Sequence, residues 1–597
     1  MYQLIDGFLD VVGIFFIVYL IGYSTFLFLS VVVGSIQLYR QHRQRRLQNY
    51  LPNDYHMPIS IIVPAWNEAV TVVATVHSLL DLEYQAYEVI VVDDGSEDDT
   101  SQTLIEAFNM HAVHRPIRRQ VPCQPEEFIY ETRTQKVPFT VIRKKNGGKA
   151  DALNMGINAA NFPYFICMDA DSVLQADSLK KIVQPMLEDR HVVAVGGLVR
   201  IANDVELEHG RVKKYRLPRN LLACMQVLEY DRSFLASRIL FDQFNGSLII
   251  SGAFGLFRKD VVIAAGGYNV STLGEDMELV VKLHEYCTVN RMDYCIRYAT
   301  DAICWTQAPE RLSDLKKQRR RWHLGLFQSM MKHRGILFNP QFGAVSFISY
   351  FYFLVYELLS PVIEIFGVAT MVLAWFSGLI NVRFMVLLFL IYVLFGVVLS
   401  LTAFFARMYT ADLRVSFADM MKAVLLCFFE ITCLRFVLTW VRATAFFGYR
   451  KSRLQWGSMK RKTINYNLIK EGKAMELNNL KTGLWGFKKQ DVCEYIAKMS
   501  EELTAKMEQE RRQNEEKLDA IVQAMRREGC DKDREIAALK EQVQVLREEN
   551  AALQKADKAW GALRDVAVLL TDCAKALLPL AGELAVKAVR QLRQRRA

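Results

Sequence analysis

The stretch YFICMDADSV, residues 164–173, decides the fold of this chain. Its apolar run Phe165–Met168 predicts a buried strand that ends in the carboxylates of Asp169 and Asp171. In an open α/β sheet, ligands bind at the carboxyl ends of the strands. Two carboxylates separated by a small residue can hold one hard divalent cation that shares its shell with substrate phosphates. An isolated pair of this kind also fits a polar turn between a strand and a helix, so the neighbouring segments decide.

Three earlier segments repeat this plan of an apolar strand followed by polar residues. They are ISIIVPAWNE at 59–68, YEVIVVDDGS at 87–96 and TVIRKKNGGKADALNMG at 140–156. Strands that alternate with helices predict a parallel sheet with right-handed crossovers, so the polar strand ends converge on one edge. We therefore predict one α/β domain over residues 55–330. Residues 108–137 break the rhythm with prolines and charges, and we expect an ordered loop insertion there.

The polar residues at these strand ends fit a nucleotide diphosphate. Asp93 and Asp94 can accept hydrogen bonds from a ribose or a base edge, and Lys149, after two glycines, can reach a diphosphate. The spacing is not that of a Walker loop. A metal ion on Asp169 and Asp171 would act as a Lewis acid on the leaving group. No Ser-His-Asp or Cys-His nucleophile set is apparent.

The second half of the domain supplies a candidate general base and a candidate anion-binding segment. LGEDMEL places Glu275 and Asp276 at a predicted helix N-terminus, where one carboxylate can serve as general base. The alternative is simple charge stabilisation of the helix. The arginines of QRRRW, residues 318–322, suit a pyrophosphate and its Trp322 suits a sugar ring, although a juxtamembrane basic belt is also possible. We expect His284 to be a surface or packing histidine.

Length, charge and cysteine usage narrow the class of protein. A chain of 597 residues with net charge +10 is too long for one core. The eleven cysteines are scattered with no CxxC pair, which argues against a disulfide framework or a zinc site. The basic clusters lack interleaved aromatics, so we expect no nucleic-acid partner.

Apolar segments predict a membrane protein. Residues 8–38 form one predicted transmembrane helix, and residues 342–448 hold further spans, the first of them divided by Pro361. Basic clusters at 40–46, 316–322 and in the linker 449–474 place the α/β domain on the cytoplasmic side of a bacterial-type inner membrane. Two or four C-terminal crossings satisfy this orientation.

Four charged residues fall within the C-terminal spans. We expect them to face a bundle interior or a polar cavity, because charge at membrane depth is costly. The alternative for the early part is an interfacial amphipathic helix. These residues are Glu357, Glu364, Glu430 and Arg435.

Residues 475–597 differ from the rest in composition. A heptad seam between Ile536 and Leu553, with Asn550 at an a position, predicts a parallel dimeric coiled coil. Residues 560–596 predict an amphipathic helix that binds an anionic membrane. The opening WGFKKQDVCEYI resembles DivIVA-like proteins, which implies a dimerising or localising tail; a solvated charged helix is the alternative.

Taken in order, PAWNE, VDDGS, NGGKADALN, MDADS, GED and QRRRW resemble the motifs of the family 2 glycosyltransferases of the GT-A fold. The resemblance covers residues 11–462 and is strongest to the processive membrane synthases of cellulose, chitin, hyaluronan and poly-N-acetylglucosamine. It implies inverting polymerisation of a UDP-sugar, with UDP-N-acetylglucosamine the preferred donor, and export of the β-linked polymer. GED stands where the family usually has TED, so Gly274 replaces a threonine.

The resemblance also implies roles for individual residues. Donor nucleotide binding falls to Glu68, Asp93, Asp94, Lys149 and Asp151. Asp169 and Asp171 would hold Mg²⁺ or Mn²⁺, and Asp276 with Glu275 would supply the base. The pyrophosphate and the acceptor end of the polysaccharide would be bound by Gln318, Arg321 and Trp322.

Two other functions compete with this interpretation. One is a non-processive glycosyltransferase that adds a single sugar to a lipid. The other is a scaffold with a silent GT-A domain, which the intact Asp171 and Asp276 disfavour. The sequence sets neither the sugar nor the linkage.

Overall fold

The computed structural model describes residues 2–48, 56–132, 137–208, 210–233, 238–379, 382–410 and 416–447, with short strands at 466–467, 482–483 and 486–487. It divides into two units, Met1–Glu471 and Gly472–Ala597. In the second unit only the antiparallel strands β14 (Thr482–Gly483) and β15 (Gly486–Phe487) are described. The predicted coiled coil, the terminal amphipathic helix and most of the basic linker lie outside the described residues.

Four parallel strands carry the segments that the sequence singled out. Side by side they are β5 (Phe139–Lys144), β2 (Tyr87–Asp93), β1 (Ile59–Ala65) and β6 (Tyr164–Cys167). Both β1 and β2 are buried along their whole length, as expected for parallel strands covered on two faces. Their carboxyl ends therefore meet at one edge, where Asp169 follows β6.

The complete sheet has ten strands and is mixed, so the prediction of a parallel sheet is wrong for the sheet as a whole. Next to β6 lies β11 (Gly255–Arg258), which is antiparallel to both β6 and β8 (Val192–Ile201). Gly255 pairs with Cys167 at the carboxyl end of β6. Because β11 starts at that edge, it must run back in the opposite direction. The long strand β12 (Cys295–Thr306) is parallel to β8.

The predicted insertion at 108–137 extends the sheet. It contains β3 (His111–Ala112) and β4 (Glu126–Glu131), and β4 pairs antiparallel with β5. Between these strands the chain is an ordered loop, as expected. Asn158 holds that loop, because its Oδ1 accepts hydrogen bonds from the backbone N–H groups of Gln120 and Val121, each at 2.9 Å.

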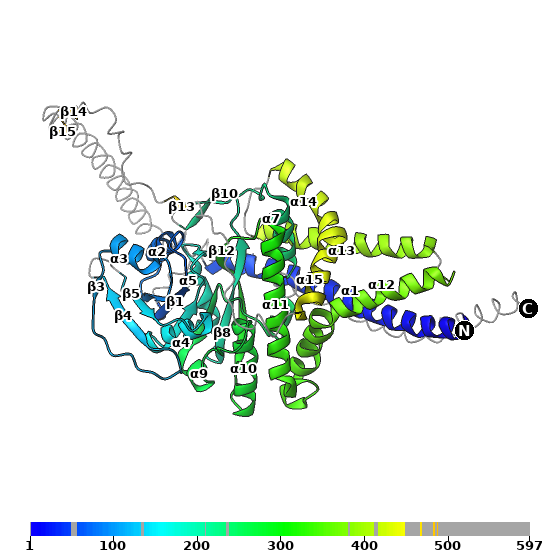
Figure 1. Ribbon diagram of the computed structural model, residues 1–597, viewed down its shortest axis with the longest axis horizontal. Coiled ribbons are helices and arrows are strands. Elements are labelled where there is room, and N and C mark those ends of the chain that lie inside the picture. The colour runs from blue at the N-terminus through cyan, green and yellow to red at the C-terminus, as the bar shows by residue number, and fades with distance from the viewer. Residues whose placement is uncertain are drawn as a thin grey trace, which may run out of the picture. The chain divides into compact units, whose positions relative to one another are not determined.

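Helices cover both faces of the sheet (Figure 1). One face packs on α2 (Val72–Leu80) and α3 (Thr100–Ala107), and the other on α4 (Lys149–Ala159) and α10 (Glu275–Val289). The remaining elements of the α/β part are β7 (Val173–Leu174), α5 (Ser178–Ile182), α6 (Gln184–Glu188), β9 (Glu206–Glu208), β10 (Arg211–Lys214), α7 (Leu221–Tyr230), α8 (Arg238–Asp242), α9 (Lys259–Ala264), α11 (Leu312–Lys332) and β13 (Tyr466–Asn467).

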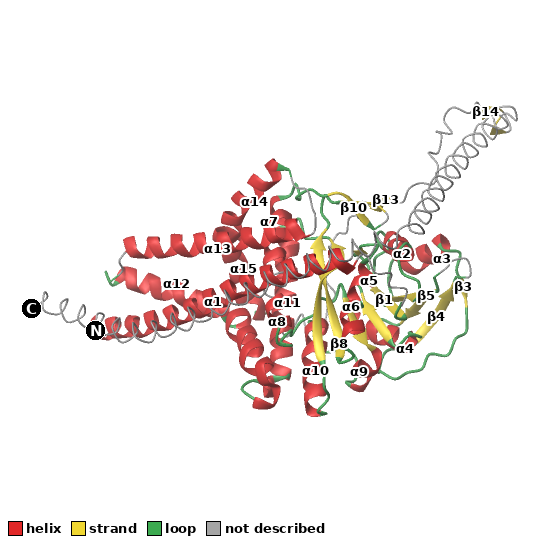
Figure 2. Ribbon diagram, turned by 180° about the vertical axis from the view of Figure 1, so that it is seen from behind, coloured by secondary structure: helices red, strands yellow, loops and turns green. Residues whose placement is uncertain are grey.

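Three described helical segments are long and apolar enough to cross a membrane: Gly7–Gln41, Met385–Tyr409 and Phe417–Phe446. A fourth joins them if the segments Val345–Leu358 and Ser360–Phe376, which meet at 49°, form one span. The break lies immediately before Pro361, as predicted. In Figure 2 α1, α12 and α13 extend away from the sheet on the same side.

The apolar helices have these bounds: α1 (Tyr2–Gln48), α12 (Ser360–Phe376), α13 (Val382–Thr410), α14 (Phe417–Phe429) and α15 (Arg435–Ala443). π-Helical turns lie at Val345–Tyr350, Phe353–Leu358 and Glu430–Leu434.

The charged residues of these helices form ion pairs. Arg435 binds Glu364 at 3.0 Å, within the helical bundle. Glu430 binds Arg232 at 2.8 Å, and Arg232 lies two residues after the last residue of α7 in the α/β domain. Pairing is the expected solution for charge at membrane depth. The Glu430 pair also joins the helices to the domain that carries the site.

Candidate active site

One cavity of about 680 Å³ opens at the carboxyl edge of the sheet and brings most predicted site residues together. Its lining includes Glu68, Lys149, Asp169, Asp171, Glu275, Asp276, Gln318, Arg321 and Trp322. These residues come from strand ends, from the starts of α4 and α10, and from α11. The convergence predicted from strand polarity is therefore present in the structure.

The pair Asp169 and Asp171 lies in the turn after β6. Asp169 leaves about a third of its side chain exposed, whereas Asp171 is buried and accepts a hydrogen bond from Ser172 at 3.3 Å. Thr75 of α2 donates to the carbonyl of Ala170 at 2.8 Å. The hydrogen bond from Thr75 thus fixes the turn, and both aspartates line the cavity.

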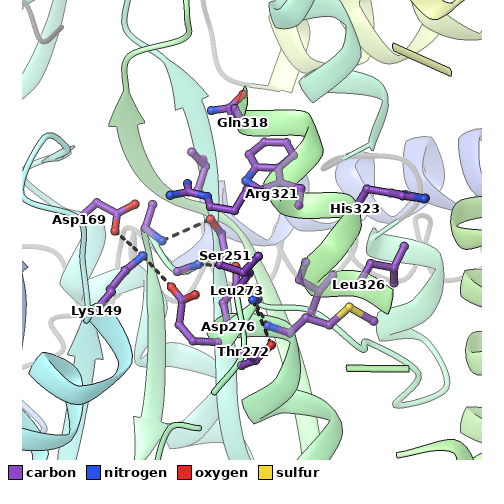
Figure 3. Close-up of a pocket in the computed structure, with 18 of the residues that line it drawn as sticks. Lys149, Asp169, Ser251, Thr272, Leu273, Asp276, Gln318, Arg321, His323 and Leu326 are labelled. Carbon is purple, nitrogen blue, oxygen red and sulfur yellow. Dashed lines mark hydrogen bonds and ion pairs between the residues drawn. The ribbon is translucent and has the colours of Figure 1, made fainter. Parts of the chain in front are cut away.

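Lys149 connects the two acidic motifs. Its Nζ lies 2.7 Å from Asp169 Oδ1, the ion pair seen in Figure 3, and 3.0 Å from Glu275 Oε1. Burial lowers the pKa of Lys149, but Asp169 and Glu275 more than offset this and raise the pKa above its ordinary value. The side chain is therefore a cation at physiological pH, held at the N-terminus of α4.

Asp276 is held at the N-terminus of α10. Its Oδ2 accepts a hydrogen bond from the backbone N–H of Gly252 at 3.2 Å, and its Oδ1 accepts one from Met277 at 2.8 Å. Burial and the adjacent Glu275 raise the pKa of Asp276, and Lys149 opposes this. A fixed carboxylate with a raised pKa suits proton abstraction.

α11 presents three of the predicted residues to the cavity. Trp322 leaves 41% of its surface exposed, a flat face that a sugar ring can cover. Gln318 Oε1 is buried and has no hydrogen-bond partner among the described residues. A buried oxygen without a partner is costly in a folded protein, and a ligand donor can satisfy it.

The other two arginines of QRRRW have different partners. Arg319 binds both oxygens of Glu229 at 2.6 and 2.7 Å, and its guanidinium lies 4.6 Å from the centre of the Trp322 ring. Arg320 points to the C-terminal helices and donates to the carbonyl of Ala445 at 3.2 Å. Arg320 thus contacts the C-terminal helices, whereas Arg319 is buried against Glu229. The alternative of a juxtamembrane basic belt stays a prediction.

Asp93 and Asp94 are fully buried and do not line the cavity. Asp94 accepts hydrogen bonds from the backbone N–H groups of Gly147 and Gly148, at 3.0 and 2.7 Å, and pairs with Lys144. Burial raises the pKa of Asp94, and Lys144 opposes this. Asp93 accepts from the Ser96 N–H at 2.8 Å. Asp94 therefore shapes the glycine turn that lines the cavity, whereas Asp93 holds the turn at Ser96. Direct nucleotide contact by either carboxylate stays a prediction.

Asp151 and Glu68 take part in the same framework. Asp151 binds Lys144 at 2.8 Å and accepts from the Gln124 N–H at 3.1 Å, outside the cavity lining. Glu68 does line the cavity, and it accepts a hydrogen bond from Thr71 at 2.7 Å. Their predicted role in nucleotide binding is open.

Three further charged residues line the cavity. Glu357 lies 4.0 Å from Arg442 of α15 and faces a polar cavity, as expected for a charged residue of these helices. Arg238 of α8 donates to the carbonyl of Ile249 at 2.7 Å, and Glu229 is a single acid in the apolar helix α7. Arg238 and Glu229 reach the cavity through contacts between segments far apart in sequence, so local patterns do not indicate them.

Two histidines of the region are neutral packing residues. His284 is buried on α10 with hydrogen bonds to Tyr294 at 2.8 Å and to the carbonyl of Ser247 at 2.9 Å, and burial lowers its pKa to about 4. Burial, with a smaller effect of Arg442, lowers the pKa of His323 to about 4. The prediction of a packing role for His284 is confirmed.

The donor set fits Mg²⁺ or Mn²⁺ held jointly with a diphosphate. Among the described residues there is no cluster of three or more His, Cys, Asp or Glu side chains that could hold a metal by itself. Mg²⁺ commonly takes one or two carboxylates and completes its shell with substrate phosphates and water. Asp169 and Asp171 supply oxygen ligands of that kind.

Comparisons with known proteins find relatives of the α/β domain. Residues 56–325 match the family model described as "Glycosyltransferase like family 2". The poly-beta-1,6-N-acetyl-D-glucosamine synthase of Staphylococcus aureus (strain COL) is 28% identical over 319 residues, which are 53% of this chain and 66% of that protein. The Staphylococcus epidermidis protein of the same name is 28% identical over 318 residues, with the same shares covered. The chain thus matches just under two thirds of the length of these relatives.

Two solved structures resemble the fold distantly. The mannosyltransferase PcManGT from Pyrobaculum calidifontis, in complex with GDP-Man and Mn²⁺, is 18% identical with a TM-score of 0.40; the match covers 68% of this chain and 99% of that one. TarS of S. aureus is 16% identical with a TM-score of 0.28, over 47% of this chain and 41% of TarS. At these scores neither bears on the site. The family match and the named relatives show that residues 56–325 are similar to family 2 glycosyltransferases, and this similarity supports a transferase.

Proposed function

We propose that the protein polymerises a UDP-sugar, with UDP-N-acetylglucosamine the preferred donor, into a β-linked polysaccharide and exports it across the membrane. The observation that carries this proposal is the extent of the cavity. The same cavity that is lined by Lys149 and Asp169 is also lined by Glu357 and Arg442 of the C-terminal helices. Polar groups therefore also line the cavity next to the C-terminal helices, where a growing polysaccharide would lie. The name of the staphylococcal relatives supports the choice of sugar.

On the donor side, Asp169 and Asp171 would hold Mg²⁺ or Mn²⁺ with the diphosphate. When bound, the ion supplies Lewis-acid stabilisation of the leaving nucleoside diphosphate. Lys149, fixed between Asp169 and Glu275, adds a cation at the same place. A preorganised cation in a partly buried site stabilises the charge that develops as the glycosidic bond to the diphosphate breaks.

On the acceptor side, Asp276 removes the proton from the attacking hydroxyl. The hydroxyl oxygen forms a bond to the anomeric carbon, the bond from that carbon to the diphosphate breaks, and the proton is held on the Asp276 carboxylate. Attack opposite the leaving group converts an α-linked donor into a β-linked product. The raised pKa of Asp276 brings its basicity closer to that required.

Residues of α11 bind the polymer. Trp322 offers a face for a sugar ring, and Gln318 Oε1 can accept a hydrogen bond from a sugar hydroxyl. Arg321 lines the cavity between them and can bind the pyrophosphate. A transferase that adds one sugar to a lipid needs only the first acceptor contact, so the extended cavity favours polymerisation.

A reconstituted assay tests this function. The purified protein in proteoliposomes receives Mg²⁺ and a panel of UDP-sugars, and UDP release and product size are measured. We expect long polymer from one donor and loss of both signals in Asp276→Asn. Asp260→Asn, at an exposed ion pair with Arg258, is the matched control and keeps activity. Products that carry a single sugar on lipid would contradict polymerisation. If no donor gave UDP release or product, the proposal that the donor is a UDP-sugar would be contradicted.

For location and assembly we propose a multi-pass membrane protein with its transferase domain on the cytoplasmic side. The basic clusters that flank the apolar helices support this orientation. We further propose that residues 475–597 self-associate through the heptad seam. Light scattering of the detergent-solubilised protein tests this. The full chain should be at least dimeric, and a chain ending at residue 474 should form an assembly of fewer chains. Equal masses would contradict the proposal.

A further inference from the structure

The loop that leads into α10 lies directly against the backbone of α11. A Cβ atom built on Gly274 would lie 2.9 Å from Gly325 Cα, and a Cβ built on Gly325 would lie 2.7 Å from the Cα and N atoms of Gly274. Real Cβ atoms do not approach backbone atoms so closely. The two glycines thus permit a backbone-to-backbone contact that any other pair of residues would prevent.

Local structure alone does not require glycine at either position. Gly274 has φ −121° and ψ 63°, outside the left-handed region, and Gly325 lies inside the 21-residue helix α11. Glycine within a helix costs about 1 kcal/mol relative to alanine. The close contact therefore explains both residues, and it explains why GED replaces the usual TED.

A side chain of α11 fastens the same loop. Gln328, nearly one turn beyond Gly325, accepts hydrogen bonds through Oε1 from the Leu273 N–H at 2.7 Å and from Thr272 Oγ1 at 3.1 Å. Thr272 Oγ1 in turn accepts from the Gly274 N–H at 3.2 Å. Figure 3 shows Thr272 and Leu273 beside Asp276 in the cavity. The loop is therefore held on α11 by the Gly274–Gly325 contact and by the hydrogen bonds to Gln328 Oε1.

A third attachment lies further along both helices. Glu278 of α10 is fully buried, and its Oε1 lies 2.5 Å from Lys332 Nζ and 3.3 Å from His333 Nε2 at the end of α11. Apolar side chains including Met277 and Met330 fill the space between the helices. Three contacts therefore fix the position of α10 relative to α11: the glycine contact, the hydrogen bonds of Gln328 and the ion pairs of Glu278.

This relative position matters because each helix carries one half of the acceptor chemistry. Asp276 lies two residues after Gly274, and Trp322 lies three residues before Gly325. A misplacement of about 1 Å between reacting groups can reduce a rate about a hundredfold. The contact between the glycines is the nearest attachment to both halves.

We propose that the Gly274–Gly325 contact, together with Gln328, positions the base Asp276 against the acceptor held on α11. These three are positioning residues: they govern the transfer step and leave donor binding unchanged. The proposal rests on the proposed function, since it requires Asp276 and α11 to act on one acceptor. The motifs assign no role to these three residues, and Gly325 and Gln328 are not among the residues that line the cavity.

The test compares variants in the proteoliposome assay, with the affinity for UDP and the melting temperature as independent readouts. For Gly325→Ala and Gly274→Ala we expect kcat to fall about tenfold to a hundredfold, with KM for the donor and the UDP Kd within about twofold of wild type. Gly335→Ala is the matched control, because a Cβ at Gly335 meets nothing within 4 Å. It should behave as wild type.

Substitutions of Gln328 keep the proposal testable if the alanine variants fail to fold. Gln328→Glu retains an acceptor oxygen at the same place and should keep kcat within about threefold, whereas Gln328→Leu, similar in size, should lose about tenfold. Wild-type kcat in Gln328→Leu would overturn the proposal. So would a loss of kcat matched by weaker UDP binding, which indicates general disruption. A wild-type protein that transfers no sugar would overturn the proposed function, and this inference with it.

Discussion

The carboxylate of Glu229 accepts two hydrogen bonds from the guanidinium of Arg319, at 2.6 and 2.7 Å. The pair is nearly enclosed, with 14% of the Glu229 side chain and 5% of the Arg319 side chain exposed. Trp322 lies against the same guanidinium. A buried pair joining α7 to α11 thus supports the aromatic residue proposed to hold the acceptor.

Glu229→Ala leaves the charge of Arg319 buried without its partner. Removing one member of a buried pair destabilises a protein by about 3–5 kcal/mol, so we expect a clear fall in melting temperature. Product length should also fall, because Trp322 loses its support. Thermal denaturation and product sizing measure the two effects. Asp260→Ala, at the exposed Arg258–Asp260 pair, should change stability by about 1 kcal/mol or less.

Lys149 is expected to act in the transfer step. Replacing it by Met keeps the length of the side chain but removes the cation between Asp169 and Glu275. Loss of one preorganised charge or hydrogen-bond donor lowers kcat by about a hundredfold to a thousandfold. Lys149→Arg keeps the charge and should retain a larger share of activity. Equal activity in Lys149→Met and wild type would exclude this role.

The raised pKa of Asp276 predicts an acidic limb in the pH profile. The base acts only when deprotonated, so kcat/KM should rise with pH through a pKa above that of an ordinary aspartate. The sign for stability is opposite. Because the folded protein holds this proton more tightly than the unfolded chain, stability falls as pH rises from the unfolded pKa to the folded pKa.

Asp276→Asn removes this pH-dependent cost. We therefore expect the inactive variant to melt at a higher temperature than wild type at neutral pH, with the difference shrinking as the pH is lowered. Melting curves over a pH series measure this. A variant less stable than wild type at neutral pH would contradict the burial argument.

Metal removal should abolish transfer, and the aspartates should set the metal requirement. After chelation, activity should return with added Mg²⁺ or Mn²⁺. Asp169→Asn retains only one of the two carboxylates, so its half-saturating Mg²⁺ concentration should rise about tenfold or more. Titration of activity against free Mg²⁺ measures it. An unchanged requirement would show that Asp169 is not a ligand.

The sequence anticipated the features that depend on local pattern and strand direction. Apolar runs that end in polar residues, such as the run before Asp169, were predicted to meet at one sheet edge, because parallel strands share their polarity. Glu275 and Asp276 were predicted at a helix N-terminus, and α10 begins there. The antiparallel direction of β11 was missed, since a four-residue strand carries no directional signal.

The partners of individual side chains were not predictable. Glu229 and Arg319 are 90 residues apart in the sequence. Gly274 contacts Gly325 only because the start of α10 packs closely against α11. Asp94 follows β2 as expected, yet it turns inward to Lys144 and the glycine turn. Such contacts depend on tertiary packing, which spacing does not reveal.

The size of the product at low conversion distinguishes a processive synthase from a transferase that adds single sugars. Proteoliposomes receive labelled UDP-N-acetylglucosamine in excess over enzyme, and products are sized after the first few per cent of donor is consumed. A processive synthase should yield long polymer at once, with length independent of enzyme concentration. Short products that lengthen in step with conversion, or sugar found singly on lipid, would contradict the account.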